Sequence, residues 1–168
     1  MYISFETDRL KIRPIALTDA AFIAVLVNTK GWLEFIGDRN ISDENDAKKY
    51  IQKILDNENF YYSTFELKDS QTPIGLVTFL HREEEEFPDF GFAMLPNYEN
   101  NGYAFEASSA YLNKLKASAN HQQFLAITKP SNAKSIKLIL KLGFQFDKNS
   151  TKEDELLSYY RLDLTNNS

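Results

Sequence analysis

The chain has 168 residues, 43% of them hydrophobic, which suits one ordinary domain with its own core and excludes a disordered or collagen-like protein. The formal net charge is −5 and the scattered basic residues form no run of five, so we expect no general nucleic-acid partner, because phosphate neutralisation needs a basic patch. The lack of cysteine excludes disulfides, thiolate zinc sites and cysteine nucleophiles.

The spacing of apolar residues predicts about seven strands and about four helices in one domain covering residues 1–168. In chain order, strands are expected at 10–13, 60–67, 74–80, 90–95 and 124–127, from 144 onward, and at 155–164, with helices after 18–19, 42, 102 and 132 and a loop at 31–37. Three consecutive strands indicate an antiparallel meander, and the strand–helix–strand stretch from 90 to 127 indicates one right-handed parallel crossover. The predicted class is therefore α+β, a mixed sheet flanked by helices.

No segment approaches the ~18 uncharged apolar residues of a membrane span, and the N-terminus has neither the basic nor the apolar region of a signal peptide. We therefore expect a cytoplasmic protein with no membrane partner. The negative net charge suits a cationic substrate such as an amine.

A polar loop at 97–102 joins the apolar strand 90–95 to a long helix and is the first sign of a binding site. The N-terminus of a helix presents unpaired backbone N–H groups and the positive end of the helix dipole, which together suit an anion. Gly102 has no Cβ, so a bulky anion can approach the backbone there. Taken alone, the loop also fits a simple turn before a helix.

Short segments in order along nearly the whole chain match one known family. They are Thr7–Pro14, Ile36–Arg39, Pro73–Gly75, Gly91–Ala107, the pattern Pro130-x-Asn132-x-x-Ser135, and Lys141–Phe144. The ordered set resembles the GNAT superfamily of N-acetyltransferases, most closely the branch that includes the ribosomal-protein-alanine N-acetyltransferases. The resemblance implies a GNAT-like fold with a splayed parallel pair of strands, acetyl-CoA as acetyl donor and an amine as acceptor.

The resemblance also implies which residues bind acetyl-CoA. The backbone amides that would cradle its pyrophosphate are those of Asn101, Gly102, Tyr103, Ala104 and Phe105. Met94 and Leu95 would pair with the pantetheine arm, and a V-shaped gap is expected to open after Met94. The backbone amide at the Met94–Leu95 kink would stabilise the oxyanion. Asn132 would point into the gap and hydrogen-bond the same arm. Glu99 departs from the family pattern, which has Gln or Arg there, and places a negative charge near a polyanion.

Without cysteine, an acetyl-cysteine intermediate is impossible, which leaves direct attack of the amine on the thioester in a ternary complex. An α-amine with a pKa of ~8 loses its proton at pH 7 for ~1.4 kcal/mol, whereas a lysine side chain with a pKa of ~10.4 needs ~4.6 kcal/mol. A weak base therefore suffices for a protein N-terminus, which is the favoured acceptor. A small-molecule amine as acceptor, or a domain that binds CoA without catalysis, remains the alternative.

Asp89 is the first candidate for the general base, because it begins the strand that lines the cleft; a solvated strand end is its alternative. Glu106 is the next candidate, with pairing at the helix terminus as its alternative. His81 and His121 are weaker candidates, expected respectively at the end of a hairpin and exposed on the surface.

Ile139 stands where many GNAT relatives carry the tyrosine that serves the leaving thiolate, so the resemblance points to Ser135 as the substitute, with packing on the helix surface as its alternative. Trp32 and Phe35 are candidate acceptor contacts, with core or lid positions as alternatives. The glutamate run 83–86 either faces solvent or attracts a cation. We expect no metal site, and a homodimer is left open.

Overall fold

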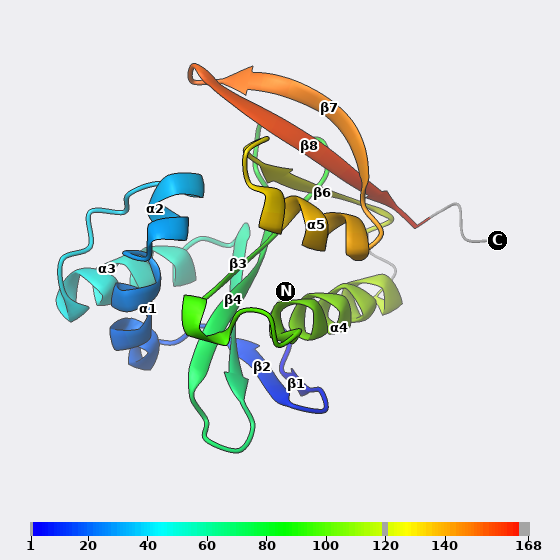
Figure 1. The fold of residues 1–168 in the computed structure, drawn as a ribbon. Helices are drawn as coiled ribbons and strands as arrows, with labels where there is room; N and C mark the ends of the chain where they lie inside the picture. Colours follow the sequence, from blue (N-terminus) through cyan, green and yellow to red (C-terminus); the bar gives the residue numbers. More distant parts are fainter. Residues whose placement is uncertain (1, 119–120, 165–168) are drawn as a thin grey trace.

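The computed structural model describes residues 2–118 and 121–164, and its centre is one mixed sheet of eight strands in the order β1-β2-β3-β4-β5-β6-β8-β7 (Figure 1). The strands are β1 (Phe5–Glu6), β2 (Leu10–Pro14), β3 (Phe60–Leu67), β4 (Pro73–Leu80), β5 (Asp89–Met94), β6 (Gln123–Thr128), β7 (Gln145–Lys152) and β8 (Glu155–Asp163). Neighbouring strands are antiparallel except β5 and β6, which are parallel. The predicted mixed sheet with one parallel pair is confirmed; the short β1, which pairs with β2, was not predicted.

The helices of the described chain include one that the sequence did not reveal. They are η1 (Leu17–Asp19), α1 (Ala20–Leu26), α2 (Lys30–Phe35), α3 (Glu44–Leu55), η2 (Pro96–Tyr98), α4 (Tyr103–Ala117) and α5 (Ala133–Lys141). α2 replaces the loop expected at 31–37, and the hydroxyl of Thr29 caps it by accepting the backbone N–H of Trp32 at 3.4 Å. Gly31 suggested a loop, but a glycine costs a helix only about 1 kcal/mol relative to alanine, and burial of Trp32 offsets that.

Two apolar clusters lie on opposite faces of the sheet. In Figure 1, α1, α2 and α3 lie on one side of the sheet and α4 and α5 on the other. The larger cluster includes Phe90 and Tyr111, and the smaller one, under α1 to α3, includes Trp32. Val77 belongs to the larger cluster and its neighbour Leu76 to the smaller one, because successive strand residues point to opposite faces. The sheet therefore separates an α4/α5 side from an α1–α3 side.

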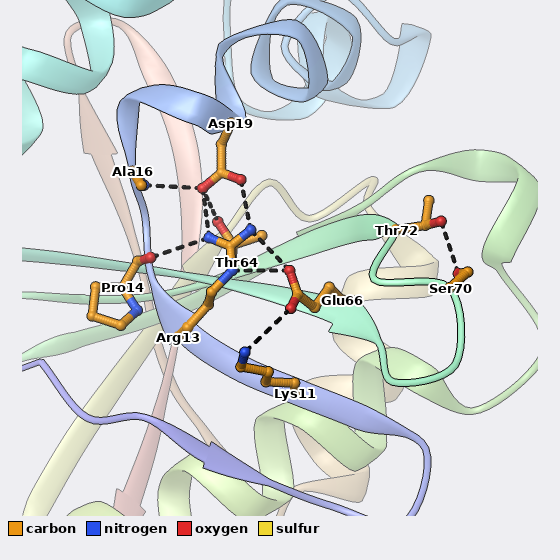
Figure 2. A network of polar contacts seen from close by, with 9 residues as sticks. All are labelled: Lys11, Arg13, Pro14, Ala16, Asp19, Thr64, Glu66, Ser70 and Thr72. Atoms are coloured by element: carbon orange, nitrogen blue, oxygen red, sulfur yellow. Dashed lines mark hydrogen bonds and ion pairs between the residues drawn. The ribbon is translucent and has the colours of Figure 1, made fainter.

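An ionic network ties β2 to β3 and to the start of α1 (Figure 2). The Arg13 guanidinium donates to both carboxylate oxygens of Asp19, at 2.9 and 2.8 Å, and to Glu66 at 2.9 Å. The Thr64 hydroxyl and the Ala16 N–H also donate to Asp19. Burial alone would raise the pKa of the Asp19 carboxyl, but these hydrogen bonds and the charge of Arg13 outweigh it and lower the pKa. Asp19 precedes α1 as predicted, yet its side chain makes no cap for that helix and instead anchors it to the sheet.

Candidate functional site

A row of free backbone amides opens α4. β5 leads through η2 and the loop 99–102 into this helix. The N–H groups from Asn100 to Phe105 donate to no acceptor within the described ranges 2–118 and 121–164, whereas the N–H of Glu106 donates to the Gly102 carbonyl at 3.0 Å. These N–H groups and the positive end of the helix dipole together suit an anion. The unpaired amides predicted around Gly102 are therefore present.

Two residues with left-handed backbone shape this loop. Asn100 has φ +63° and Gly102 has φ +79°, a region that asparagine and glycine enter at the least cost. The side-chain amide of Asn101 donates to the carbonyls of Tyr98 and Glu99 at 3.3 and 2.9 Å. Turns of this kind bring successive N–H groups to one concave side, as in many phosphate sites.

Arg9, which precedes β2, holds the loop in place and was not predicted from the sequence. Its guanidinium donates to the Asn101 carbonyl at 2.9 Å and to the Glu106 carboxylate at 2.7 Å, and lies 4.4 Å from the centre of the Tyr103 ring. A trans peptide directs its C=O and its N–H to opposite sides. The bond to the Asn101 carbonyl therefore turns the N–H of Gly102 away from Arg9.

Glu106 holds Arg9 in this position, and we call the two residues the clamp on the loop. Its carboxylate also accepts the Thr7 hydroxyl at 2.6 Å and the Arg9 backbone N–H at 2.9 Å. Burial would raise the pKa of Glu106, but the hydrogen bonds from Thr7 and Arg9 and the charge of Arg9 lower it. A carboxylate with a lowered pKa and donors on both oxygens is a poor general base, so the structure favours a structural role; its partners are Thr7 and Arg9 and not the helix terminus that the alternative named. Thr7 and Arg9 lie in a segment that carries the family resemblance, which was the only sequence signal for them.

A lysine compensates the unusual Glu99. This carboxylate pairs with the Nζ of Lys134, which lies in the first turn of α5. The Lys134 side chain is 80% exposed and that of Glu99 31% exposed, so the pair lies at the surface. It joins the loop before α4 to α5 and neutralises the negative charge beside the free amides.

The parallel strands β5 and β6 diverge as soon as they meet. Their register contains the single pair Asp89↔Leu125. The gap was expected to open after Met94, but ladder pairing between the two strands already ends at Asp89. Beyond Phe90, the backbone edge of β5 therefore has no ladder pairing with β6, and the α5 side of the sheet separates from the β1–β5 side (Figure 1).

The groups on that open edge differ from those predicted. The N–H of Leu95 donates to the Ile74 carbonyl of β4 at 2.9 Å, so it is not available to a pantetheine arm or an oxyanion, contrary to expectation. In an antiparallel ladder, alternate residues face the same neighbour. Because Leu95 faces β4, the N–H and C=O of Phe92 and Met94 face the open edge. Met94 therefore stays a predicted contact of the pantetheine arm, and Phe92 becomes a further candidate.

Asn132 and Ser135 meet at the start of α5. The side-chain oxygen Oδ1 of Asn132 accepts the Ser135 backbone N–H at 3.3 Å, and the side-chain amide nitrogen Nδ2 donates to the Thr128 hydroxyl at 3.2 Å. Asn132 therefore caps the helix, with one amide hydrogen and one lone pair left over. The Ser135 hydroxyl has no hydrogen-bond partner in the part of the chain that is described. Contact of either residue with a ligand stays a prediction.

Asp89 is buried, so the alternative of a solvated strand end is wrong. Its exposed fraction is 7%, and one carboxylate oxygen accepts from the Arg82 guanidinium at 2.9 Å. Burial raises the pKa of the Asp89 carboxyl above its ordinary value, although the charge and hydrogen bond of Arg82 oppose the rise. A carboxyl with a raised pKa suits proton transfer near neutral pH.

The glutamate run is only partly solvated, because Glu85 turns inward. Its side chain is 10% exposed and accepts the Lys152 ammonium at 2.9 Å and the Tyr159 hydroxyl at 3.0 Å. Burial and the neighbouring Glu85 raise the pKa of Tyr159, and Glu85 also acts electrostatically on Asp89. Glu85, Asp89, Lys152 and Tyr159 thus form one polar cluster where β5 and β6 meet. We call it the junction cluster.

The predicted acceptor contacts lie on α2. Trp32 is 5% exposed within the smaller core, and its buried ring N–H has no partner in the described chain. The Arg39 guanidinium lies 5.8 Å from its ring centre. Phe35 is half-buried. The structure favours the core alternative for Trp32, and contact of either residue with an acceptor stays a prediction.

The two histidines contact each other. The ring centres of His81 and His121 lie 5.1 Å apart, and Phe79 lies 5.0 and 5.4 Å from them. His121 is therefore packed rather than exposed as expected. Burial, and for His81 also the charge of His121, lowers the pKa of both imidazoles.

Two surface hollows lie away from the α4 amides. One, of about 600 Å³, borders the network of Figure 2, and the other, of about 230 Å³, borders His81 and Arg82. Among residues 2–118 and 121–164, no three His, Cys, Asp or Glu side chains are grouped to hold a metal ion. No helix in these ranges is long and apolar enough to cross a membrane.

Comparisons with known proteins place these features in a wider context. Residues 9–145 match the family model described as "Acetyltransferase (GNAT) domain". The protein called uncharacterized N-acetyltransferase YnaD, from Bacillus subtilis (strain 168), is 27% identical over 139 residues, which are 83% of this chain and 81% of that protein.

Solved structures share the whole fold. The ribosomal-protein-S5-alanine acetyltransferase from Vibrio fischeri has a TM-score of 0.82 at 19% identity and covers 98% of each chain. The spermidine N-acetyltransferase from Vibrio cholerae, solved in complex with CoA and spermine, has a TM-score of 0.80 at 15% identity and covers 95% of this chain and 98% of its own. At these identities, the likeness bears on the fold alone.

Proposed function

Since the chain belongs to the GNAT family of acetyltransferases and is an N-acetyltransferase, we propose that it moves the acetyl group of acetyl-CoA onto a primary amine, with the α-amine of a protein or peptide favoured. The observation that carries the choice of donor is the row of unpaired N–H groups from Asn100 to Phe105. A diphosphate needs several donors on one concave surface, and this row supplies them together with the positive helix end.

The residues present fit acetyl-CoA along its length. The amides from Asn101 to Phe105 would hold the pyrophosphate, as the resemblance implies. The free backbone edge at Phe92 and Met94 would pair with the amide groups of the pantetheine arm as an added strand does. Asn132 retains one amide hydrogen for the same arm. When bound, acetyl-CoA supplies a thioester that an amine can attack directly.

Two protein groups would move protons in this reaction. Asp89, with its raised pKa, would accept a proton from the acceptor ammonium. The junction cluster around it offers a second carboxylate, Glu85. The unpartnered hydroxyl of Ser135 would donate a hydrogen bond to the leaving thiolate, because Ile139 is buried in the core and offers no hydroxyl.

The energetics of deprotonation favour an α-amine as acceptor. Its proton is lost at pH 7 for only ~1.4 kcal/mol, so a weak base suffices. One observation favours a second candidate, a small polyamine: the junction cluster already holds an ammonium, that of Lys152, against Glu85 and Glu84. A cytoplasmic location belongs to the same proposal.

Thiol release in the presence of acetyl-CoA tests the function with little background, because the chain has no cysteine of its own. Peptides with a free N-terminus should release thiol, and the same peptides with a blocked N-terminus and an internal lysine should not. Release with spermine alone would move the acceptor to the second candidate. Thermal stabilisation by CoA without release for any amine would contradict the catalytic proposal.

A further inference from the structure

The Glu99–Lys134 pair lies beside the free amides and joins the two sides of the splay. Glu99 is the first residue of the loop that leads to the N–H row, and Lys134 follows Asn132 by two residues, on α5. We propose that Lys134 is an anion-binding residue that exchanges partners, leaving the Glu99 carboxylate for a phosphate of CoA when the cofactor enters. This inference rests on the proposed function and adds a specific role for a residue pair outside the predicted site.

Two other cations near the loop, Arg9 and Lys141, are held by contacts of their own. Arg9 is fixed by Glu106 and the Asn101 carbonyl. The Lys141 ammonium lies 4.2 Å from the centre of the Phe105 ring. Lys134, in contrast, has a side chain that is 80% exposed, and within the described part of the chain its ammonium pairs with Glu99 alone. A flexible lysine bound to a single partner can exchange that partner most easily.

The balance of charges favours the exchange. An exposed lysine–carboxylate pair contributes little stability, so it can be broken at small cost. A phosphate carries more negative charge than a carboxylate and accepts strong charge-assisted hydrogen bonds from an ammonium. Without Lys134, the Glu99 carboxylate would face the incoming phosphates uncompensated. Lys134 therefore offsets the charge of Glu99 in the absence of CoA and offers a positive charge to the phosphate when CoA binds.

If Lys134 exchanges partners, substitutions of Glu99 and Lys134 should change the affinity for CoA, whereas a fixed surface ion pair would leave it unchanged. Glu99→Gln removes the competitor for Lys134, so the affinity for CoA should rise roughly three- to fivefold. Lys134→Met in the native background should weaken CoA binding about tenfold or more, since it also uncovers Glu99. Lys134→Met in the Glu99→Gln background should still weaken binding roughly threefold, because the contact with phosphate is lost there too.

The experiment measures dissociation constants by isothermal titration calorimetry with CoA and dephospho-CoA as the probes. Lys137→Met is the matched control, because Lys137 is exposed on the same helix and makes no ion pair within the described chain; its affinity should match the native protein. An effect of Lys134→Met that persists with dephospho-CoA assigns the contact to the pyrophosphate, and one that vanishes assigns it to the 3′-phosphate. Both results support the exchange.

Two results separate failure of this inference from failure of the proposed function. If the native protein binds CoA but Lys134→Met has no effect in the Glu99→Gln background, the exchange is wrong and the function stands. If the native protein does not bind CoA, the proposed function fails, and the exchange fails with it.

Discussion

The conformation of Gly102 gives a sharp prediction about cofactor affinity. Its φ of +79° lies in the left-handed region, which costs a residue with a Cβ roughly 1–2 kcal/mol. A Cβ at this position would lie 3.5 Å from the Arg9 guanidinium, an ordinary contact, so Gly102→Ala introduces backbone strain without a clash. No backbone hydrogen bond within the described chain fixes the amides from Asn100 to Phe105, so the loop can relieve the strain by moving them, at the expense of the contact between Arg9 and the Asn101 carbonyl.

Binding would then have to restore the loop, and the strain would appear as lost affinity. At 1.4 kcal/mol per tenfold, 1–2 kcal/mol corresponds to about a five- to thirtyfold weaker binding of CoA. Calorimetric titration of both proteins with CoA measures this change. Gly143→Ala is the matched control, because Gly143 also has a positive φ, +97°, but follows α5. It should lower thermal stability and leave CoA affinity unchanged. Native affinity in the folded Gly102→Ala protein would refute the reasoning.

Three further predictions concern other parts of the site. Arg9→Met should raise the KM for acetyl-CoA several-fold with little change in kcat, since the clamp on the loop is lost; an equal fall in kcat alone would contradict a positioning role. Ser135→Ala should lower kcat about 10²-fold with little change in KM, as measured by thiol release, and an unchanged kcat would exclude the hydroxyl as the hydrogen-bond donor to the leaving thiolate. His81 and His121 have lowered pKa values, so the unfolded chain binds more protons: their contribution to stability is present above about pH 6.5 and is lost as pH falls below it. Urea unfolding of the native protein should therefore show a larger loss of stability between about pH 8 and about pH 5.5 than that of His81→Phe, and equal losses would contradict this.

Local sequence patterns were sufficient for most of the fold. The order of strands and helices, the parallel pair and the amide row at Gly102 follow from periodicity and from glycine chemistry. α2 was missed because Gly31 outweighed the cap at Thr29, and the benefit of burying Trp32 depends on tertiary packing. β1 was missed because a strand of two residues has too short a pattern to recognise.

The site depended more on contacts between distant segments. Arg9 contacts Asn101 across more than half the chain, and no local pattern indicates such a contact. Glu85 sits in a run of glutamates that local chemistry predicts to be solvated, and only Lys152 and Tyr159 draw it inward. The hydrogen bond that occupies the Leu95 amide depends on the register of β4 against β5. Register is set by the whole sheet, so residue type alone could not show which amides remain free.

The central claim is that the amides opening α4 bind the diphosphate of CoA, and amide NMR tests it most directly. In ¹⁵N-labelled protein titrated with CoA, the resonances from Asn100 to Phe105 should shift the most and saturate together. The N–H of Leu95, which is already bonded to β4, should shift less than that of Met94. Saturable binding of CoA that leaves the resonances from Asn100 to Phe105 unmoved would contradict the account.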